Sequence, residues 1–221
     1  MRQAARAAIL LLLGGLTACT QAAPAFDYWV LALSWSPQYC ASQPRGTPQC
    51  QRPYAFVVHG LWPQFERGYP AHCEPKPAPV PEAWINRLLP LMPSPALIEH
   101  QWRKHGTCSG LGVDGYFEAT RQARSSVVIP PAFVAPEDYL HTSPAQIRAQ
   151  FLALNPGLSP AALSLHCEGR HLRELRLCLD RGLQFRACGA DVKDRCPTDR
   201  LSLRPSRAGA SSTVGDGSAG R

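Results

Sequence analysis

Cysteine limits the folds open to this chain more than any other residue type does. The sequence contains nine cysteines and no C-x-x-C pair, which disfavours a zinc ribbon or a thioredoxin-like redox site. If Cys19 belongs to an export signal, an even set of eight remains: Cys40, Cys50, Cys73, Cys108, Cys167, Cys178, Cys188 and Cys196. An even set in an oxidising compartment predicts four disulfides and hence a cross-linked fold.

The N-terminus predicts export. Arg2 and Arg6 precede the apolar run AAILLLLGGL, which is too short to span a bilayer, so we predict a signal peptide over residues 1–18. The tetrapeptide LTAC resembles the lipobox of bacterial lipoproteins, in which the cysteine, here Cys19, is acylated. Ordinary cleavage within TQAAPA is the alternative. Both routes predict a periplasmic protein, anchored to the membrane as a lipoprotein or free, or a secreted one.

Charge gives a weak indication of the partner. The formal charge is +7, and loss of Arg2 and Arg6 reduces the 23 basic residues to 21 against 16 acidic ones, a charge of +5. A moderate positive charge suits a phosphate-bearing polyanion. Solubility and compositional bias explain the same charge, so composition alone selects no function.

The order of the predicted elements is strands, then helices, then strands again, which favours an α+β domain. The predicted strands lie within residues 26–40, 53–63, 163–169, 172–180 and 183–188, and the helices near 82–89, 95–105, 113–127 and 143–154. We expect Gly60 and Pro63 to break the second strand and Asp114 to cap the third helix. Residues 205–221 have no apolar periodicity, which predicts a disordered tail.

The segment EHQWRKHGTC, residues 99–108, carries an unusual group of polar side chains. On a helix, His100, Lys104, Gln101 and His105 fall in that order within about 140° of arc. One face then presents two imidazoles, an ammonium and an amide. Because His100 and His105 diverge by about 140°, they are poorly placed to share one metal ion. We therefore expect no metal site, and resistance of the activity to EDTA tests this.

His59 ends an apolar strand in VVHGLWPQ, which is a rigid support for a side chain that faces a cleft. Together with His105 it supplies a general acid and a general base near neutral pH. Cleavage of RNA by its own 2′-hydroxyl uses such a pair without a metal. Cations stabilise charge on the phosphoryl oxygens, and an aromatic ring such as that of Trp62 stacks on a base.

Three segments resemble a known family. FVVHGLWPQ and EHQWRKHGTCSG are similar to the two active-site segments of the ribonuclease T2 family, and they occur in the family's order about 40 residues apart. YWVLALSWSPQYC resembles the first core strand of that family. The resemblance implies one catalytic domain over residues 26–198. It also implies an α+β fold with a central antiparallel β-sheet flanked by helices and stabilised by disulfides.

The resemblance implies a role for each matching residue. His59 would be the general acid of the first step and His105 the general base. His100 and Lys104 would hold the phosphate, and Trp62 would stack on a base. The implied activity is that of a monomeric endoribonuclease that cleaves single-stranded RNA with low base specificity. It would leave 2′,3′-cyclic phosphate ends and need no cofactor.

The resemblance also implies disulfide pairs, namely Cys40–Cys50, Cys73–Cys108, Cys167–Cys196 and Cys178–Cys188. Two positions depart from the family pattern. Gln101 stands where many members have a glutamate; an amide can donate to a phosphoryl oxygen, but it lacks the charge that would raise the pKa values of His100 and His105. Gln64 stands where Asp or Asn often contacts the base, so an inherited base preference does not follow.

The alternative from a different class is a catalytically impaired RNA-binding module of the same fold. Gln101 motivates this interpretation, whereas the presence of both His59 and His105 argues against it. Alanine at either histidine separates the two, because only an enzyme has RNA cleavage to lose.

Overall fold

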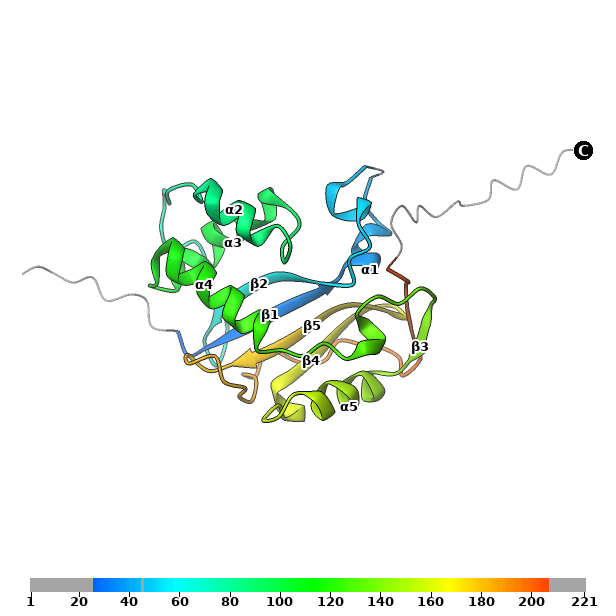
Figure 1. Cartoon of the computed structure of the whole chain (residues 1–221). Coiled ribbons are helices and arrows are strands. Elements are labelled where there is room, and N and C mark those ends of the chain that lie inside the picture. Colours follow the sequence, from blue (N-terminus) through cyan, green and yellow to red (C-terminus); the bar gives the residue numbers. More distant parts are fainter. Residues whose placement is uncertain (1–25, 45, 207–221) are drawn as a thin grey trace, which may run out of the picture.

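The computed structural model describes residues 26–44 and 46–206. Its centre is a four-stranded antiparallel sheet in the order β2-β1-β5-β4 (Figure 1). These strands are β1 (Tyr28–Trp35), β2 (Phe56–Gln64), β4 (Leu163–Glu168) and β5 (His171–Leu179). A second sheet pairs β3 (Leu140–Thr142) with β6 (Leu201–Leu203). The predicted α+β class with a central antiparallel sheet is confirmed.

Strand β1 separates the two faces of the central sheet, because alternate residues of a strand point to opposite sides. Four alternate side chains, each at most 2% exposed, enter the main hydrophobic core: Trp29, Leu31, Leu33 and Trp35. On the opposite face, Tyr28 and Val30 join a small apolar cluster. Ala32 and Ser34 follow on that face, which leaves its middle free for polar groups.

The helices are α1 (Ser36–Cys40), α2 (Glu82–Leu88), α3 (Pro95–Lys104), α4 (Gly112–Ser125) and α5 (Pro144–Leu154). Short 3₁₀ turns are η1 (Pro48–Gln51), η2 (Gly106–Cys108), η3 (Pro131–Phe133) and η4 (Pro160–Ala162). Figure 1 shows α2, α3 and α4 grouped at one end of the molecule, with α1 and β3 at the other. The candidate residues of α3 therefore lie at the end that α2 and α4 share.

Serine–proline pairs begin two of the predicted helices, those near residues 95–105 and 143–154. The Ser94 hydroxyl accepts the backbone N–H of Leu97, and the Ser143 hydroxyl accepts that of Gln146. The expected cap of the third helix is wrong, because α4 already begins after Leu111. Asp114 instead accepts the indole N–H of Trp84.

The expected break in the second strand is also wrong, since β2 runs through Gly60 and Pro63 to Gln64. This strand lies at the edge of the sheet, where a proline removes no necessary ladder hydrogen bond. Gly60 lies beside a register shift in the pairing with β1, and such bulges accept glycine readily. The edge position therefore permits two residues that would disrupt a central strand.

The last predicted strand, residues 183–188, is not formed. It contributes one isolated bridge, between Leu179 and Phe185. Leu183 has a positive φ of 65°, so the chain turns where the pattern predicted extended backbone. Conversely, β3 and β6 are too short, at three residues each, to produce a detectable alternation.

Four disulfides cross-link the fold, and they are the pairs that the resemblance implies: Cys40–Cys50, Cys73–Cys108, Cys167–Cys196 and Cys178–Cys188. Cys73–Cys108 joins the loop after β2 to the turn at the end of α3. Cys178–Cys188 ties the end of β5 to the segment beyond it. The cross-links thus secure the loops that leave the central sheet.

Several predictions concern residues outside the described ranges. These are the signal peptide, the acylation of Cys19, and the tail beyond Ser206. Within residues 26–44 and 46–206, no helix is long and apolar enough to cross a membrane.

Removal of Cys73–Cys108 is expected to destabilise the fold more than removal of Cys40–Cys50. The first disulfide spans 35 residues and the second spans 10. Loop-closure entropy then predicts losses of about 4 and about 3 kcal/mol. The double variant Cys73→Ala/Cys108→Ala should unfold at a lower guanidinium concentration than Cys40→Ala/Cys50→Ala. Equal midpoints or the reverse order would contradict this expectation.

Candidate active site

A β-bulge places His59 on the polar face of the central sheet. In the register of β2 with β1, Val58 and Gly60 have partners, whereas His59 between them has none. A bulge interrupts the alternation of side chains and re-aims the extra residue. His59 and Trp62, three positions apart, consequently meet on one face with ring centroids 5.2 Å apart.

Strand β2 meets helix α3 at Gly60. The Trp62 indole Nε1 donates to Oε1 of Gln101 at 2.8 Å, and Gln101 is only 1% exposed. A methyl group on Gly60 would lie 2.1 Å from that oxygen and 2.4 Å from the indole nitrogen. Glycine is therefore required at this position, and the hydrogen bond fixes the Trp62 ring relative to the helix.

Helix α3 and its end carry the remaining predicted residues of the second segment. His100 is exposed, Lys104 is half-buried, and His105, which caps the helix, is buried. The Trp62 and His105 rings are stacked, with centroids 5.4 Å apart and 27° between their planes. Trp62 also makes an edge-to-face contact with His59, at 82°. The two imidazoles thus share one indole ring between them.

The loop after β2 lies beside the end of α3. The Tyr69 ring centroid is 6.2 Å from that of His105, and Nζ of Lys104 is 5.9 Å from the Tyr69 centroid. The backbone N–H of His72 donates to the carbonyl of Lys104 at 2.9 Å, one residue before Cys73. Tyr69 is exposed, so an aromatic face is available next to the histidine and the lysine.

Burial makes His105 a neutral imidazole. Desolvation, followed by the positive charge of Lys104 and the neighbouring His100, lowers its pKa from 6.5 to about 3. Its Nδ1 is buried without a hydrogen-bond partner among the described residues, whereas an imidazolium carries an N–H on both nitrogens. Partial desolvation, followed by the charge of Lys104, also lowers the pKa of His100, although its side chain is largely exposed. A neutral His105 is able to accept a proton.

His59 lies beside a carboxylate, whereas His105 lies beside a cation. Its Nδ1 lies 2.6 Å from Oε2 of Glu174, whose Oε1 accepts from Nε of Arg176 at 2.7 Å. Burial by itself would raise the pKa of Glu174, but the hydrogen bond and charge of His59 and the charge of Arg176 outweigh burial and lower it to about 2. Since an ionised carboxylate only accepts hydrogen bonds, Nδ1 of His59 carries the proton in this contact.

Known proteins resemble this chain over most of its described residues. Residues 26–188 match the model of the ribonuclease T2 family. A ribonuclease of Aeromonas hydrophila is 35% identical over 176 residues, which make up 77% of this chain and 80% of that protein. The chain belongs to the ribonuclease T2 family. It is accordingly an endoribonuclease.

Solved structures share the fold of this ribonuclease. RNase NT in complex with 5′-AMP superposes with a TM-score of 0.62 at 24% identity and covers 82% of this chain and 99% of its own. Trichomaglin, an S-like ribonuclease, superposes with a TM-score of 0.65 at 21% identity and covers 83% of this chain and 100% of its own. At these identities the likeness establishes the architecture.

Gln64 is the predicted site residue whose placement fits its predicted role least. Its side chain is buried at the end of β2, where Nε2 donates to the carbonyl of Pro63 at 3.0 Å. Base contact by Gln64 stays a prediction, and it would require the amide to leave this hydrogen bond. Among residues 26–44 and 46–206, no group of three or more His, Cys, Asp or Glu side chains is arranged to hold a metal ion.

Glu174, Arg176 and Tyr69 belong to this site although no motif in the sequence singles them out. In HLRELRLCL, Glu174 and Arg176 are two positions apart and so share one face of β5, while the buried Leu175 and Leu177 take the other. A carboxylate and a guanidinium on an otherwise buried strand are a signal of polar chemistry. Only the pairing of β5 with β1 brings this face next to His59.

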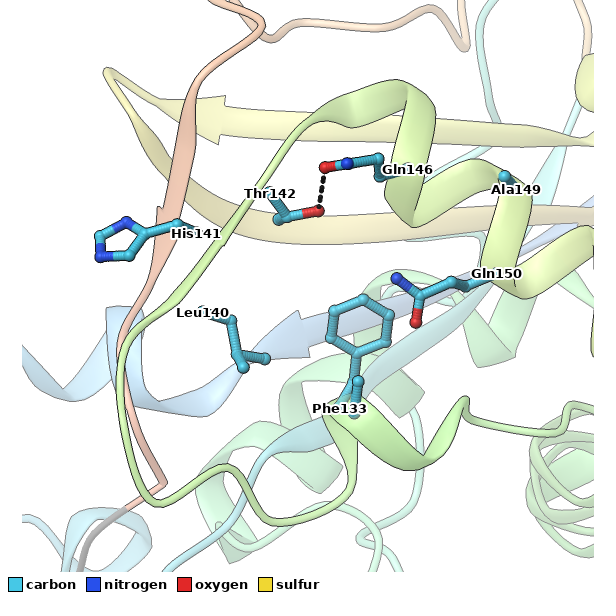
Figure 2. Close-up of a pocket in the computed structure, with 8 residues that line it drawn as sticks. Phe133, Leu140, His141, Thr142, Gln146, Ala149 and Gln150 are labelled. Carbon is cyan, nitrogen blue, oxygen red and sulfur yellow. Dashed lines mark hydrogen bonds between the residues drawn. The ribbon is translucent and has the colours of Figure 1, made fainter.

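A pocket of about 430 Å³ lies in another part of the ribonuclease, between η3, β3 and α5 (Figure 2). Figure 2 shows Phe133, Leu140 and His141 around it, with Gln146 and Gln150 projecting from α5. None of the predicted site residues lines this pocket. Its single titratable side chain is His141, so it lacks the pair of groups that acid–base catalysis requires.

Gly60→Ala is expected to impair the ribonuclease while the protein stays folded. The added methyl group would displace the Gln101 oxygen or the Trp62 ring and so misalign the stack on His105. We expect kcat/KM for RNA to fall by roughly 10²-fold, because misplacement of about 1 Å has such effects. The free energy of unfolding should fall by only about 1–3 kcal/mol.

Gly182→Ala is the matched control for this substitution. Its methyl group would lie 3.3 Å from a side-chain oxygen of Asp180, in a turn outside the site, so activity should stay native. Native activity in Gly60→Ala would show that the contact between β2 and α3 does not set the geometry of the site.

Proposed function

We propose that this endoribonuclease cleaves single-stranded RNA by transphosphorylation and leaves 2′,3′-cyclic phosphate ends. The observation that carries the proposal is the pair of imidazoles on Trp62, one bound to a carboxylate and the other buried beside a cation. Environments that separate two titratable groups in this way assign one as acid and the other as base. His59 is the general acid and His105 is the general base.

The reaction moves one proton at each histidine. Neutral His105 accepts the proton of the 2′-hydroxyl while that oxygen forms its bond to phosphorus. His59 gives a proton to the 5′-oxygen as the bond between phosphorus and that oxygen breaks. The products are a cyclic phosphodiester and a free 5′-hydroxyl, and water takes no part in this step. Positioned proton transfer of this kind contributes about 10²–10⁴-fold to the rate.

Lys104, His100 and Gln101 would stabilise the charge that develops on the phosphoryl oxygens. Lys104 supplies a cation and Gln101 an amide N–H₂, since the Gln101 oxygen already accepts from Trp62. The exposed Tyr69 offers an aromatic face for base stacking. The Trp62 ring already stacks on His105 and lies 5.0 Å from the guanidinium carbon of Arg176, so a base that stacks on Trp62 would displace one of these contacts. Because every base has a π-face, recognition by stacking supports low base specificity.

We place the enzyme outside the cytoplasm, as a monomer in the periplasm or in the medium. The four disulfides support an oxidising compartment. The lipobox-like LTAC supports a lipid anchor at Cys19, with ordinary signal cleavage as the alternative.

Alanine at either proton-transfer histidine is expected to remove most RNA cleavage. His59→Ala and His105→Ala should lower kcat/KM for single-stranded RNA by about 10²–10⁴-fold. His141→Ala, which alters an exposed histidine of β3, should keep native activity. Mass analysis of early digests should find cyclic phosphate ends, with EDTA and without it. Linear ends from the outset or inhibition by EDTA would contradict the mechanism, and RNA binding without cleavage by the native protein would favour the binding module.

Gln101→Glu should move the acid limb of the pH–rate profile to higher pH. Because His105 must be neutral to act, activity is lost as the pH falls through its pKa, which burial places at about 3. A carboxylate can still accept the Trp62 N–H, so the ring keeps its place, but the negative charge raises the pKa of His105. Profiles of kcat/KM against pH for both proteins test this shift. Superimposable profiles would show that a charge at position 101 does not change the pKa of His105.

A further inference from the structure

His59 and Glu174 meet across an intervening strand. β2 and β5 both pair with β1, so their backbones lie about 9–10 Å apart. The contact of 2.6 Å between Nδ1 and Oε2 spans this gap. The strand beneath presents only Ala32 and Ser34 there, and Ser34 is the register partner of Glu174. The bulge at His59 and these two small side chains together make the contact possible.

Glu174 is itself held in place. Its Oε1 accepts from Nε of Arg176 at 2.7 Å, and its Oε2 accepts from the Ser34 hydroxyl at 3.4 Å as well as from His59. The side chain is 8% exposed. A carboxylate so buried needs hydrogen bonds and positive partners, and all of these contacts lie on the polar face of the sheet. Glu174 is therefore a fixed acceptor behind the imidazole.

We propose that Glu174 is a positioning residue that holds His59 in the tautomer and orientation of a general acid. This inference rests on the proposed function of His59. With Nδ1 donating to Glu174, Nε2 is the nitrogen that exchanges a proton with the leaving oxygen. In the proton-donating form of His59, Nε2 carries a proton as well as Nδ1. A buried carboxylate acts on histidine in the same way in Ser-His-Asp triads.

Of the two histidines, His59 has a carboxylate beside it, whereas His105 has a cation. Burial and the cation Lys104 disfavour a proton on His105. A carboxylate behind His105 would favour its protonated form, in which it cannot accept a proton, whereas the carboxylate behind His59 orients that ring through Nδ1. The sheet therefore supplies the proton donor and the end of α3 supplies the acceptor.

Two uridine substrates distinguish this role from a merely structural one. In the dinucleotide uridylyl-adenosine, the departing 5′-oxygen needs a proton. In the nitrophenyl ester of uridine 3′-phosphate, the nitrophenolate leaves without one. The isosteric variant Glu174→Gln should lower kcat/KM for the dinucleotide by roughly 10²-fold. It should change kcat/KM for the nitrophenyl ester by less than about threefold.

Glu118→Gln is the matched control. It removes a carboxylate that is paired with Arg121 on the surface of α4, so both rates should stay native. Native dinucleotide cleavage by Glu174→Gln overturns the proposal. An equal loss on both substrates by a folded variant also overturns it, because a structural defect would affect both reactions alike.

Two further variants keep the test decisive if Glu174→Gln fails to fold, as judged by its thermal unfolding. Glu174→Asp keeps the carboxylate but places it one methylene group farther from His59. It should therefore lower kcat/KM for the dinucleotide and not for the nitrophenyl ester, by less than Glu174→Gln does. In the His59→Ala background, a substitution at Glu174 should cause no further loss on the dinucleotide. A fully additive loss would show that Glu174 does not act through His59.

The two proposals can fail separately. If the native enzyme forms cyclic phosphate ends and His59→Ala is impaired on the dinucleotide alone, the proposed function stands whatever Glu174→Gln does. If His59→Ala retains dinucleotide cleavage, the assignment of the acid fails first, and the role of Glu174 fails with it.

Discussion

The hydrogen bond from the Trp62 indole to the Gln101 amide is the contact on which the site depends. It joins an edge strand to a helix from a separate part of the chain, and it exists because Gly60 has no side chain. Both imidazoles rest on the ring that this bond orients, His59 by its edge contact and His105 by stacking. The two segments that carry the candidate residues thereby form one rigid surface, as a precisely positioned site requires.

One face of the central sheet packs in the hydrophobic core, and the other face carries the polar groups of the candidate site. One face of β1 and β5 is committed to the hydrophobic core through its leucines, which secures the position of the strands. The other face can then carry charged groups, because its carboxylate and guanidinium neutralise one another beside His59. The bulge at His59 moves this candidate catalytic side chain onto the polar face of the sheet. Stability and function thus occupy opposite sides of the same strands.

Local patterns in the sequence predicted those parts of the structure that depend on local rules. Ser94 and Ser143 mark helix starts because a helix cap depends on only a few neighbouring residues. The contact between His59 and Glu174 could not be predicted in this way, because it depends on the register of three strands and on one unpaired residue. Likewise, the tolerance of β2 for Pro63 follows from its edge position, which only the assembled sheet defines.

The unlike environments of the two histidines also bear on the fate of the cyclic phosphate. Its hydrolysis requires the histidines to exchange roles, so that His105 donates a proton and His59 accepts one. Burial opposes a proton on His105, and the hydrogen bond from Nδ1 to Glu174 holds the ring of His59 in the orientation of a donor. On the proposed assignment, the arrangement that favours the first step therefore disfavours the second. The cyclic phosphate is then the product that this site is built to release, and its hydrolysis is the slower reaction.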